Sequence, residues 1–159
     1  MVREHRKLAA VLAADVVGYS RLMGRDESGT LARLREHRTT RLEPTLARYE
    51  GRLVKLMGDG AIVEFSSACD ALSAATEFQQ AVNEVDQRPE TGRIVFRIGL
   101  HLGDMIVEGD GLYGDGVNIA ARLETVAPAG GILISGTVHE AVAGRLKESV
   151  AVRPGLELS

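Results

Sequence analysis

The alternation of hydrophobic and polar positions divides the chain into short strands and amphipathic helices. A nearly unbroken apolar run over 8–17 is typical of a strand covered on both faces. Residues 93–102 alternate, with apolar side chains at the even positions, which predicts a strand with one buried face. Two short apolar runs, 53–57 and 61–65, flank Gly58-Asp59-Gly60, and this arrangement indicates a β-hairpin.

Apolar side chains at helical spacing predict the helices. Residues 26–48 carry one apolar stripe, and Pro44 is expected to kink or split that helix. A second helix, with a stripe that ends at Val85, follows Ser66 and Ser67, which can cap it. The remaining predicted elements are a strand over 105–108 as hairpin partner of 93–102, a helix over 115–127 capped by Asp115, a strand over 131–135 and a helix over 137–146.

The predicted order of elements is βαββαββαβα, without an internal repeat or a linker. We therefore expect a single domain over 1–159 with an α+β fold. The expected architecture is a ferredoxin-like sandwich: a βαββαβ core with an added strand hairpin and helix, and a sheet with helices packed on one face.

Composition narrows the class of protein. With 159 residues, 45% of them hydrophobic, the chain can bury one core. Its 19 basic and 22 acidic residues give a net charge of −3 without a basic stripe, so a nucleic-acid partner is not expected. Cys69 is the single cysteine, which favours a reducing compartment and a cytoplasmic location.

The N-terminal apolar run does not fit an export signal or a membrane span. Basic residues precede it, as in a signal peptide, but Asp15 interrupts it and no small-residue cleavage site follows. No stretch approaches the ~18 apolar residues of a membrane span.

Asp15 is out of place at the end of a buried strand. A carboxylate there costs several kcal/mol unless it is paired, hydrogen-bonded or bound to a metal. Taken alone, Asp15 is best explained as a residue that caps its own turn. The turn behind it leads toward a helix and can present backbone N–H groups to a phosphate. This turn consists of Val16, Val17, Gly18, Tyr19 and Ser20.

Three further positions carry candidate chemistry. Asp59 at the hairpin tip is alone a good turn residue, but with Asp15 it offers two carboxylates from two strand ends that could share divalent ions. Lys55 lies on an apolar strand face, where it either extends to solvent or bonds a purine atom. Asn118 and Arg122, four residues apart in YGDGVNIAARLE, share one helical face and can stabilise phosphoryl charge; otherwise they form an exposed polar face.

Together these motifs resemble the class III adenylate and guanylate cyclase catalytic domain over residues 7–145. AADVVGYSRL resembles the family's first metal motif and KLMGDG its second, and RIGLHLGD with YGDGVNIAARLE is similar to its closing motif. The resemblance implies that Asp15 and Asp59 bind two Mg²⁺ or Mn²⁺ ions per site. It implies that Lys55 selects the base, that Asn118 orients the ribose and that Arg122 stabilises the transferring phosphate.

The resemblance also implies an assembly and a reaction. Sites would form between two subunits of a homodimer, with Asp15 and Asp59 from one chain facing Lys55, Asn118 and Arg122 from the other. The ribose 3′-OH of ATP or GTP would attack the α-phosphorus, and pyrophosphate would leave. Lys55 favours ATP.

The sequence departs from the family pattern at two places. Gly111 stands at a second base-selecting position where the family often has Asp or Thr, so the choice between ATP and GTP stays open. The phosphate-binding lysine that many members carry near the C-terminus has no counterpart after Lys147. This indicates a truncated chain or one that continues into another region.

Three alternatives compete with an active cyclase. A catalytically silent, cyclase-like dimeric regulatory module would not need the complete set of site residues. A diguanylate cyclase or a polymerase palm domain also uses two carboxylates to bind metal ions, but the GG[DE]EF turn of the diguanylate cyclases is absent from this sequence. An unrelated ferredoxin-like binding domain leaves Asp15, Lys55 and Arg122 unexplained.

Overall fold

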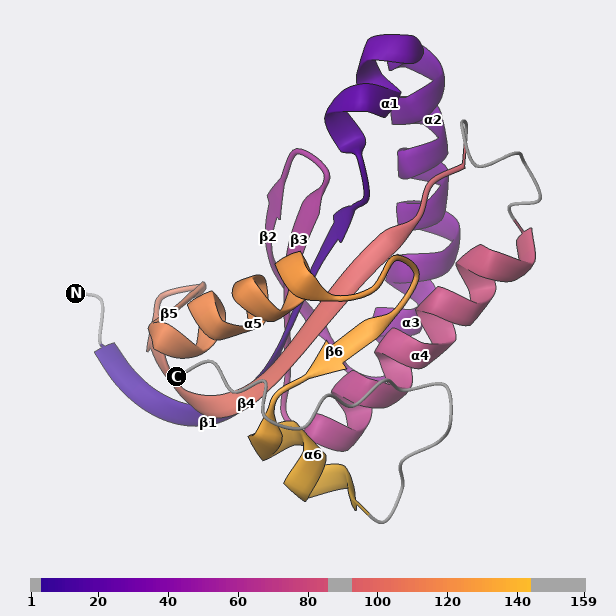
Figure 1. Ribbon diagram of the computed structural model, residues 1–159. Coiled ribbons are helices and arrows are strands. Elements are labelled where there is room, and N and C mark those ends of the chain that lie inside the picture. Colours follow the sequence, from indigo (N-terminus) through magenta and orange to yellow (C-terminus); the bar gives the residue numbers. More distant parts are fainter. Residues whose placement is uncertain (1–3, 86–92, 144–159) are drawn as a thin grey trace.

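The fold is a six-stranded sheet that carries helices. The computed structural model describes residues 4–85 and 93–143. The sheet has the order β2-β3-β1-β4-β5, and β6 pairs with β4 in parallel (Figure 1). The strands are β1 Glu4–Val16, β2 Arg52–Met57, β3 Gly60–Phe65, β4 Phe96–Glu108, β5 Gly111–Tyr113 and β6 Ile132–Ile134. The helices are α1 Tyr19–Arg25, α2 Glu27–His37, the π-helix η1 Arg38–Leu42, α3 Glu43–Arg48, α4 Ala68–Val85, α5 Asp115–Val126 and α6 Gly136–Val142.

The order of the first four strands confirms the predicted ferredoxin-like α+β fold. β1 lies between β3 and β4, and both pairings are antiparallel, as a βαββαβ core requires. Its alternate residues point to opposite faces of the sheet. Leu12 and Val16 enter the larger core with α4, whereas Val11 and Ala13 enter a second cluster with residues of α5.

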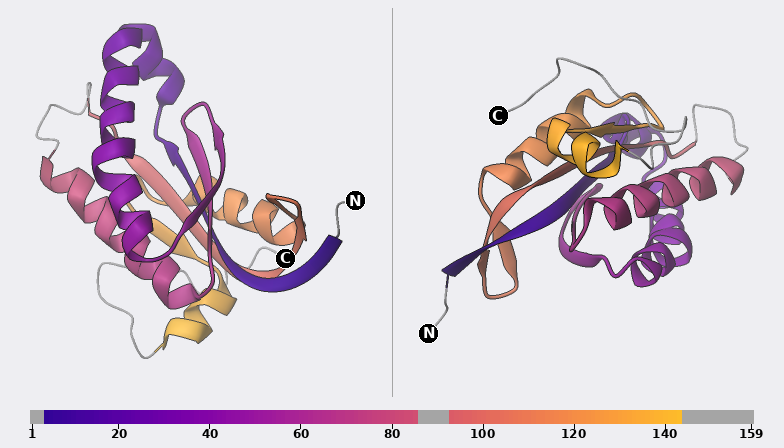
Figure 2. Two further views of the ribbon diagram at one scale, coloured as in Figure 1. Left: turned by 180° about the vertical axis from the view of Figure 1, so that it is seen from behind. Right: turned by 90° about the horizontal axis from the view of Figure 1, so that it is seen from below.

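Helices pack on both faces of the sheet rather than on one. The segments of the predicted core, α2–α3 and α4, lie on the same face, while the added helix α5 covers the other (Figure 2). Gly99 allows the close approach of α5, because a Cβ there would lie 2.4 Å from Ala120 O and from Glu124 N. The face of the sheet that α5 covers matters because polar residues lie at one end of it.

The predicted strand over 105–108 is the continuation of β4 and not its hairpin partner. Met105 pairs with Lys7 and Asp104 with Leu8, in the same register as the rest of the β1–β4 ladder. The chain turns later, at Gly109, whose φ of 59° suits glycine. The hairpin partner is therefore β5.

The expected break near Pro44 takes the form of a π-helical segment. η1 joins α2 to α3 directly, and Pro44 lies in the first turn of α3, where its missing N–H is tolerated. Ser67 caps α4 as expected, by accepting a hydrogen bond of 3.0 Å from Asp70 N. The N-cap of α5 is Gly114 instead of Asp115, which occupies the first turn.

The C-terminal elements agree with expectation as far as they are described. β6 and α6 lie within the predicted ranges 131–135 and 137–146, and residues 144–146 fall outside the described part. In 4–85 and 93–143, no helix has both the length and the apolar character needed to cross a membrane.

Candidate active site

Asp15 lies near the end of β1, directly opposite Arg97 of β4, on the face that α5 covers. Arg97 Nη2 donates to both carboxylate oxygens of Asp15 at 3.3 Å. Its Nη1 donates to Thr125 O, near the end of α5, at 2.9 Å. Arg97 thus fixes the orientation of the Asp15 carboxylate and ties the last turn of α5 to the sheet.

Asp59 reaches the same end of the sheet from the β2–β3 hairpin. The tight turn places Gly58 at a φ of 56°, and Asp59 Oδ2 then accepts a hydrogen bond of 3.0 Å from Val16 N. Since Val16 follows Asp15 directly, the two carboxylates that the sequence pointed to converge. The structure brings these two residues together within one chain.

Glu124 is a third carboxylate at this place. It lies on α5 with its side chain 11% exposed, and its Oε2 is buried without a hydrogen-bond donor among the described residues. Burial, together with the neighbouring carboxylates of Asp15 and Asp59, raises the pKa of Glu124 to about 8, while Arg97, 3.6 Å away, opposes the rise. Negative charge therefore exceeds positive charge at this end of the sheet.

Arg97 and Glu124 belong to the site although sequence reasoning had not assigned them. Both lie within the motifs RIGLHLGD and YGDGVNIAARLE, in which a strand pattern and a helix pattern account for them. A charged residue on an otherwise apolar strand or helix face is the sequence signal that could have identified them. Their proximity itself follows from the register of β1 with β4 and from the packing of α5.

The carboxylates fit a divalent cation in chemistry and in charge. Oxygen ligands suit Mg²⁺, and the orphaned Oε2 of Glu124 marks a deficit of positive charge. Within 4–85 and 93–143, no three His, Cys, Asp or Glu side chains form a complete metal-binding group. Ions held by Asp15 and Asp59 would need further ligands, such as phosphate oxygens of a substrate.

The turn after β1 is partly engaged within the chain. Val16 N donates to Asp59 and Val17 N to Val95 O at 2.8 Å, so these two N–H groups are already bonded. Gly18 adopts a φ of 64°, and Tyr19 and Ser20 open α1. The N–H groups of Gly18, Tyr19 and Ser20 come before the first hydrogen bond of this helix, which Leu22 N donates to Gly18 O.

Lys55, Asn118 and Arg122 are exposed. Asn118 and Arg122 occupy the solvent side of α5, while Ala120 and Leu123 of the same helix face the sheet. None of the described acidic side chains pairs with Lys55 or Arg122. The structure places these three residues where a second molecule can reach them.

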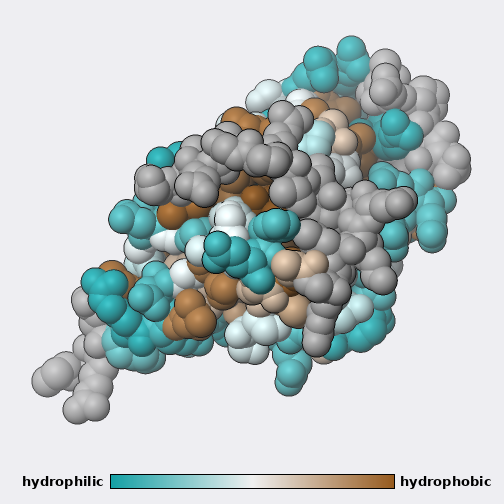
Figure 3. Space-filling view, turned by 60° about the horizontal axis from the view of Figure 1, so that its bottom comes forward, coloured by the Kyte–Doolittle hydropathy of each residue, from teal (hydrophilic) through white to brown (hydrophobic). Residues whose placement is uncertain are grey.

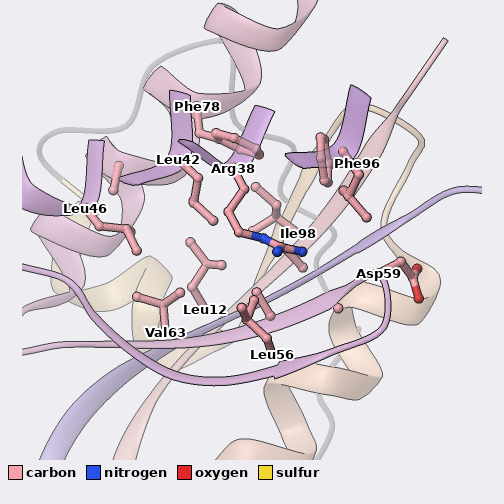
Figure 4. Close-up of a pocket in the computed structure, with 15 residues that line it drawn as sticks. Leu12, Arg38, Leu42, Leu46, Leu56, Asp59, Val63, Phe78, Phe96 and Ile98 are labelled. Carbon is pink, nitrogen blue, oxygen red and sulfur yellow. The ribbon is translucent and has the colours of Figure 1, made fainter. Parts of the chain in front are cut away.

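Apolar side chains accompany Lys55 at the surface. Leu53, Leu56 and Met57 of β2, the strand of Lys55, are 37%, 43% and 48% exposed. Figure 3 shows apolar side chains between hydrophilic ones on the underside of the molecule. Beside Asp59 lies a narrow apolar crevice of about 30 Å³, into which the guanidinium of Arg38 points (Figure 4).

Comparisons with known proteins agree with this geometry. The family described as the adenylate and guanylate cyclase catalytic domain matches residues 1–155. "Putative adenylate cyclase 3" of Rhizobium meliloti is 50% identical over 141 residues, which are 88% of this chain and 24% of that protein. An "Adenylate cyclase" of Streptomyces coelicolor is 31% identical over 79% of this chain and 32% of its own length. The chain thus spans a third or less of these curated relatives.

A solved structure extends the likeness to three dimensions. The adenylate/guanylate cyclase/hydrolase from Silicibacter pomeroyi has a TM-score of 0.86 and 41% identity, covering 92% of this chain and 86% of that chain. Sequence motifs, fold and relatives point the same way, and the chain belongs to the adenylate and guanylate cyclase catalytic-domain family.

Proposed function

We propose that this domain converts a purine nucleoside triphosphate, ATP in preference to GTP, into the 3′,5′-cyclic nucleotide and pyrophosphate. The observation that carries the proposal is the convergence of Asp15 and Asp59 in one chain, with an excess of negative charge around them. Relatives named adenylate cyclases support the choice of ATP.

The reaction makes one bond and breaks one. The ribose 3′-oxygen bonds to the α-phosphorus, the bond from that phosphorus to the bridging oxygen breaks, and pyrophosphate takes that oxygen away. The 3′-OH proton is lost to solvent. Two bound Mg²⁺ or Mn²⁺ ions would favour loss of this proton and would neutralise the triphosphate.

The residues of this chain have distinct roles in that scheme. Asp15 and Asp59 would hold the cations, and Arg97 keeps Asp15 in place through three hydrogen bonds of 3.3 Å. Asn118 and Arg122 bind the ribose and the reacting phosphate, where charge accumulates in the transition state. Lys55 donates to the purine ring.

We further propose that each site is shared by the two chains of a homodimer. Lys55, Asn118 and Arg122 are exposed, and no hydrogen bond or ion pair among the described residues joins Lys55 or Arg122 to a carboxylate of its own chain. Exposed apolar residues of β2 flank Lys55, as expected of a surface that a partner covers. In a C2 dimer, both sites would be equivalent.

Base selection rests on Lys55, because Gly111 has no side chain to add a second contact. The ratio of kcat/KM for ATP to that for GTP should therefore be modest, since one polar partner is worth ~1–3 kcal/mol. A ratio above about a thousandfold would show that another residue selects the base.

The proposal is tested by incubating the protein with ATP or GTP and Mg²⁺ or Mn²⁺ and measuring cyclic product. For the shared site, Asp59→Ala and Arg122→Ala are each expected to be nearly inactive. In a mixed heterodimer, one site carries both lesions and the other neither. Random exchange gives about half heterodimers, so the mixture should recover on the order of a quarter of wild-type activity.

Two outcomes would contradict these claims separately. If the wild-type protein, shown to be folded, makes no cyclic product with either nucleotide, it is a silent regulatory module instead of an enzyme. If the wild type is active and subunit exchange is demonstrated, but the mixture stays at the level of the single variants, the site is built within one chain.

A further inference from the structure

A cleft of about 390 Å³ opens between α1 and the start of β4, and three arginines line it. Arg21 and Arg25 reach it from α1, and Arg93 from the segment that precedes β4. Its other lining residues are apolar, so no acidic side chain is among the described residues that line it. Guanidinium groups gathered on an apolar wall favour an anion of high charge.

The cleft begins directly beside the Asp15–Arg97 pair. Val17 and Val95 line it and are joined by a hydrogen bond of 2.8 Å. They lie two residues beyond Asp15 and two residues before Arg97, a span of ~6.6 Å in extended chain. This distance is comparable to the length of the two outer phosphates of a nucleoside triphosphate.

Two of the arginines are placed to bind an anion. Arg93 Nε is buried without an acceptor among the described residues, and a buried donor that lacks a partner costs free energy. Arg21 folds back against the turn after β1: its Nη2 lies 2.8 Å from where a Cβ on Gly18 would be. The guanidinium of Arg21 thus lies against the same turn that follows Asp15.

We infer that Arg21 and Arg93 bind the β- and γ-phosphates of the substrate and, after the reaction, pyrophosphate. This inference rests on the proposed cyclase function and assigns residues to the phosphate tail. Several guanidinium groups match the charge and the tetrahedral oxygens of a polyphosphate better than those of a single carboxylate.

The test compares pyrophosphate with 5′-AMP, which lacks the outer phosphates. Dissociation constants of both are measured by calorimetry with Mg²⁺ for the wild type and the Arg21→Ala, Arg93→Ala and double variants. Arg35→Ala is the matched control, because Arg35 is exposed on α2 outside the cleft. Thermal melting and Arg93→Lys, which keeps the charge, show whether a loss reflects the site or the fold.

Each single variant should bind pyrophosphate about tenfold more weakly and the double variant more weakly still, since a charged hydrogen bond is lost. Affinity for 5′-AMP should change less than about twofold, the control should match the wild type, and Arg93→Lys should recover part of the loss. In the same variants, KM for ATP should rise together with the dissociation constant for pyrophosphate.

Unchanged pyrophosphate binding in the double variant would overturn the inference, and so would equal losses for pyrophosphate and 5′-AMP. In both cases, cyclic product made by the wild type would leave the proposed function intact. A wild type that binds neither compound and forms no product would instead overturn both claims.

Discussion

Two buried glutamates on the same face of the sheet have opposite ionisation behaviour. Glu64 of β3 and Glu124 of α5 have side chains 6% and 11% exposed. Burial disfavours the charged form of Glu64, but hydrogen bonds from Lys7 and Arg52 outweigh it and lower its pKa. Burial and two neighbouring carboxylates raise the pKa of Glu124 to about 8.

The difference separates a structural region from a functional one. Arg52 Nη2 lies 2.7 Å from Glu64, so the chain itself neutralises the buried carboxylate. At the other end of the face, Arg97 contacts both Asp15 and Glu124, and Asp59 adds a third carboxylate that acts on Glu124. A folded chain tolerates such an imbalance where an external cation binds, which agrees with the proposed metal site.

The largest expected effect concerns the two carboxylates at the functional end. Asp15→Ala and Asp59→Ala should each lower kcat/KM by more than ~10³-fold, because the cations lose a ligand. Circular dichroism and melting should show a folded protein in each case. Asp26→Ala, which removes an exposed carboxylate that caps α2, is the control and should retain activity. Appreciable cyclase activity in either site variant would exclude the two-metal assignment.

The next effect concerns the distance between α5 and the sheet. Gly99→Ala should lower the free energy of unfolding by about 3 kcal/mol, because its Cβ would lie 2.4 Å from two backbone atoms of α5. Activity should fall as well, since α5 carries Asn118 and Arg122. Gly24→Ala is the control: nothing lies within 4 Å of its Cβ, and stability should be unchanged or slightly higher. Equal stability of both variants in urea would contradict the tight α5 contact.

The fold was largely predictable from periodicity, whereas the electrostatics of the site were not. The hairpin around Asp59 and the alternating strand over 93–102 are local patterns; the structure contains the hairpin, and the strand forms from Phe96 onward, with residues 93–95 outside it. The extent of β4 was wrong, because Gly103-Asp104 has the composition of a turn and only pairing with β1 keeps it extended. Arg97 and Glu124 depend on register and on helix packing, which link residues 82 and 109 positions away from Asp15.

A smaller effect is expected from Glu124→Gln in metal-free protein. A carboxyl whose pKa is raised in the folded state stabilises the fold fully below its unfolded value, about 4.5, and loses that contribution as pH rises toward 8. Wild-type stability should therefore fall between pH 5 and 9. Glutamine cannot ionise, so the variant should be the more stable protein at pH 9 by on the order of 2 kcal/mol. Melting in EDTA across this range measures the difference, and parallel curves would contradict the raised pKa.

The smallest effect, with the opposite sign, is expected from Glu64→Gln. The lowered pKa of Glu64 means that its ionised form stabilises the fold above the unfolded value, about 4.5, and that this contribution is lost as pH falls through the folded value. Because Lys7 and Arg52 are 46% and 43% exposed, solvent screens the pairs, and the variant should lose only about 1 kcal/mol at pH 7. The loss should shrink as pH falls below 4.5, where the wild-type carboxyl takes up its proton. Urea unfolding at pH 7 and pH 3.5 measures this change. If Glu64→Gln stabilised the protein at pH 7, the cations beside Glu64 would be insufficient to neutralise it, as at Glu124. The contrast between a neutralised end and a cation-binding end of this face would then be wrong.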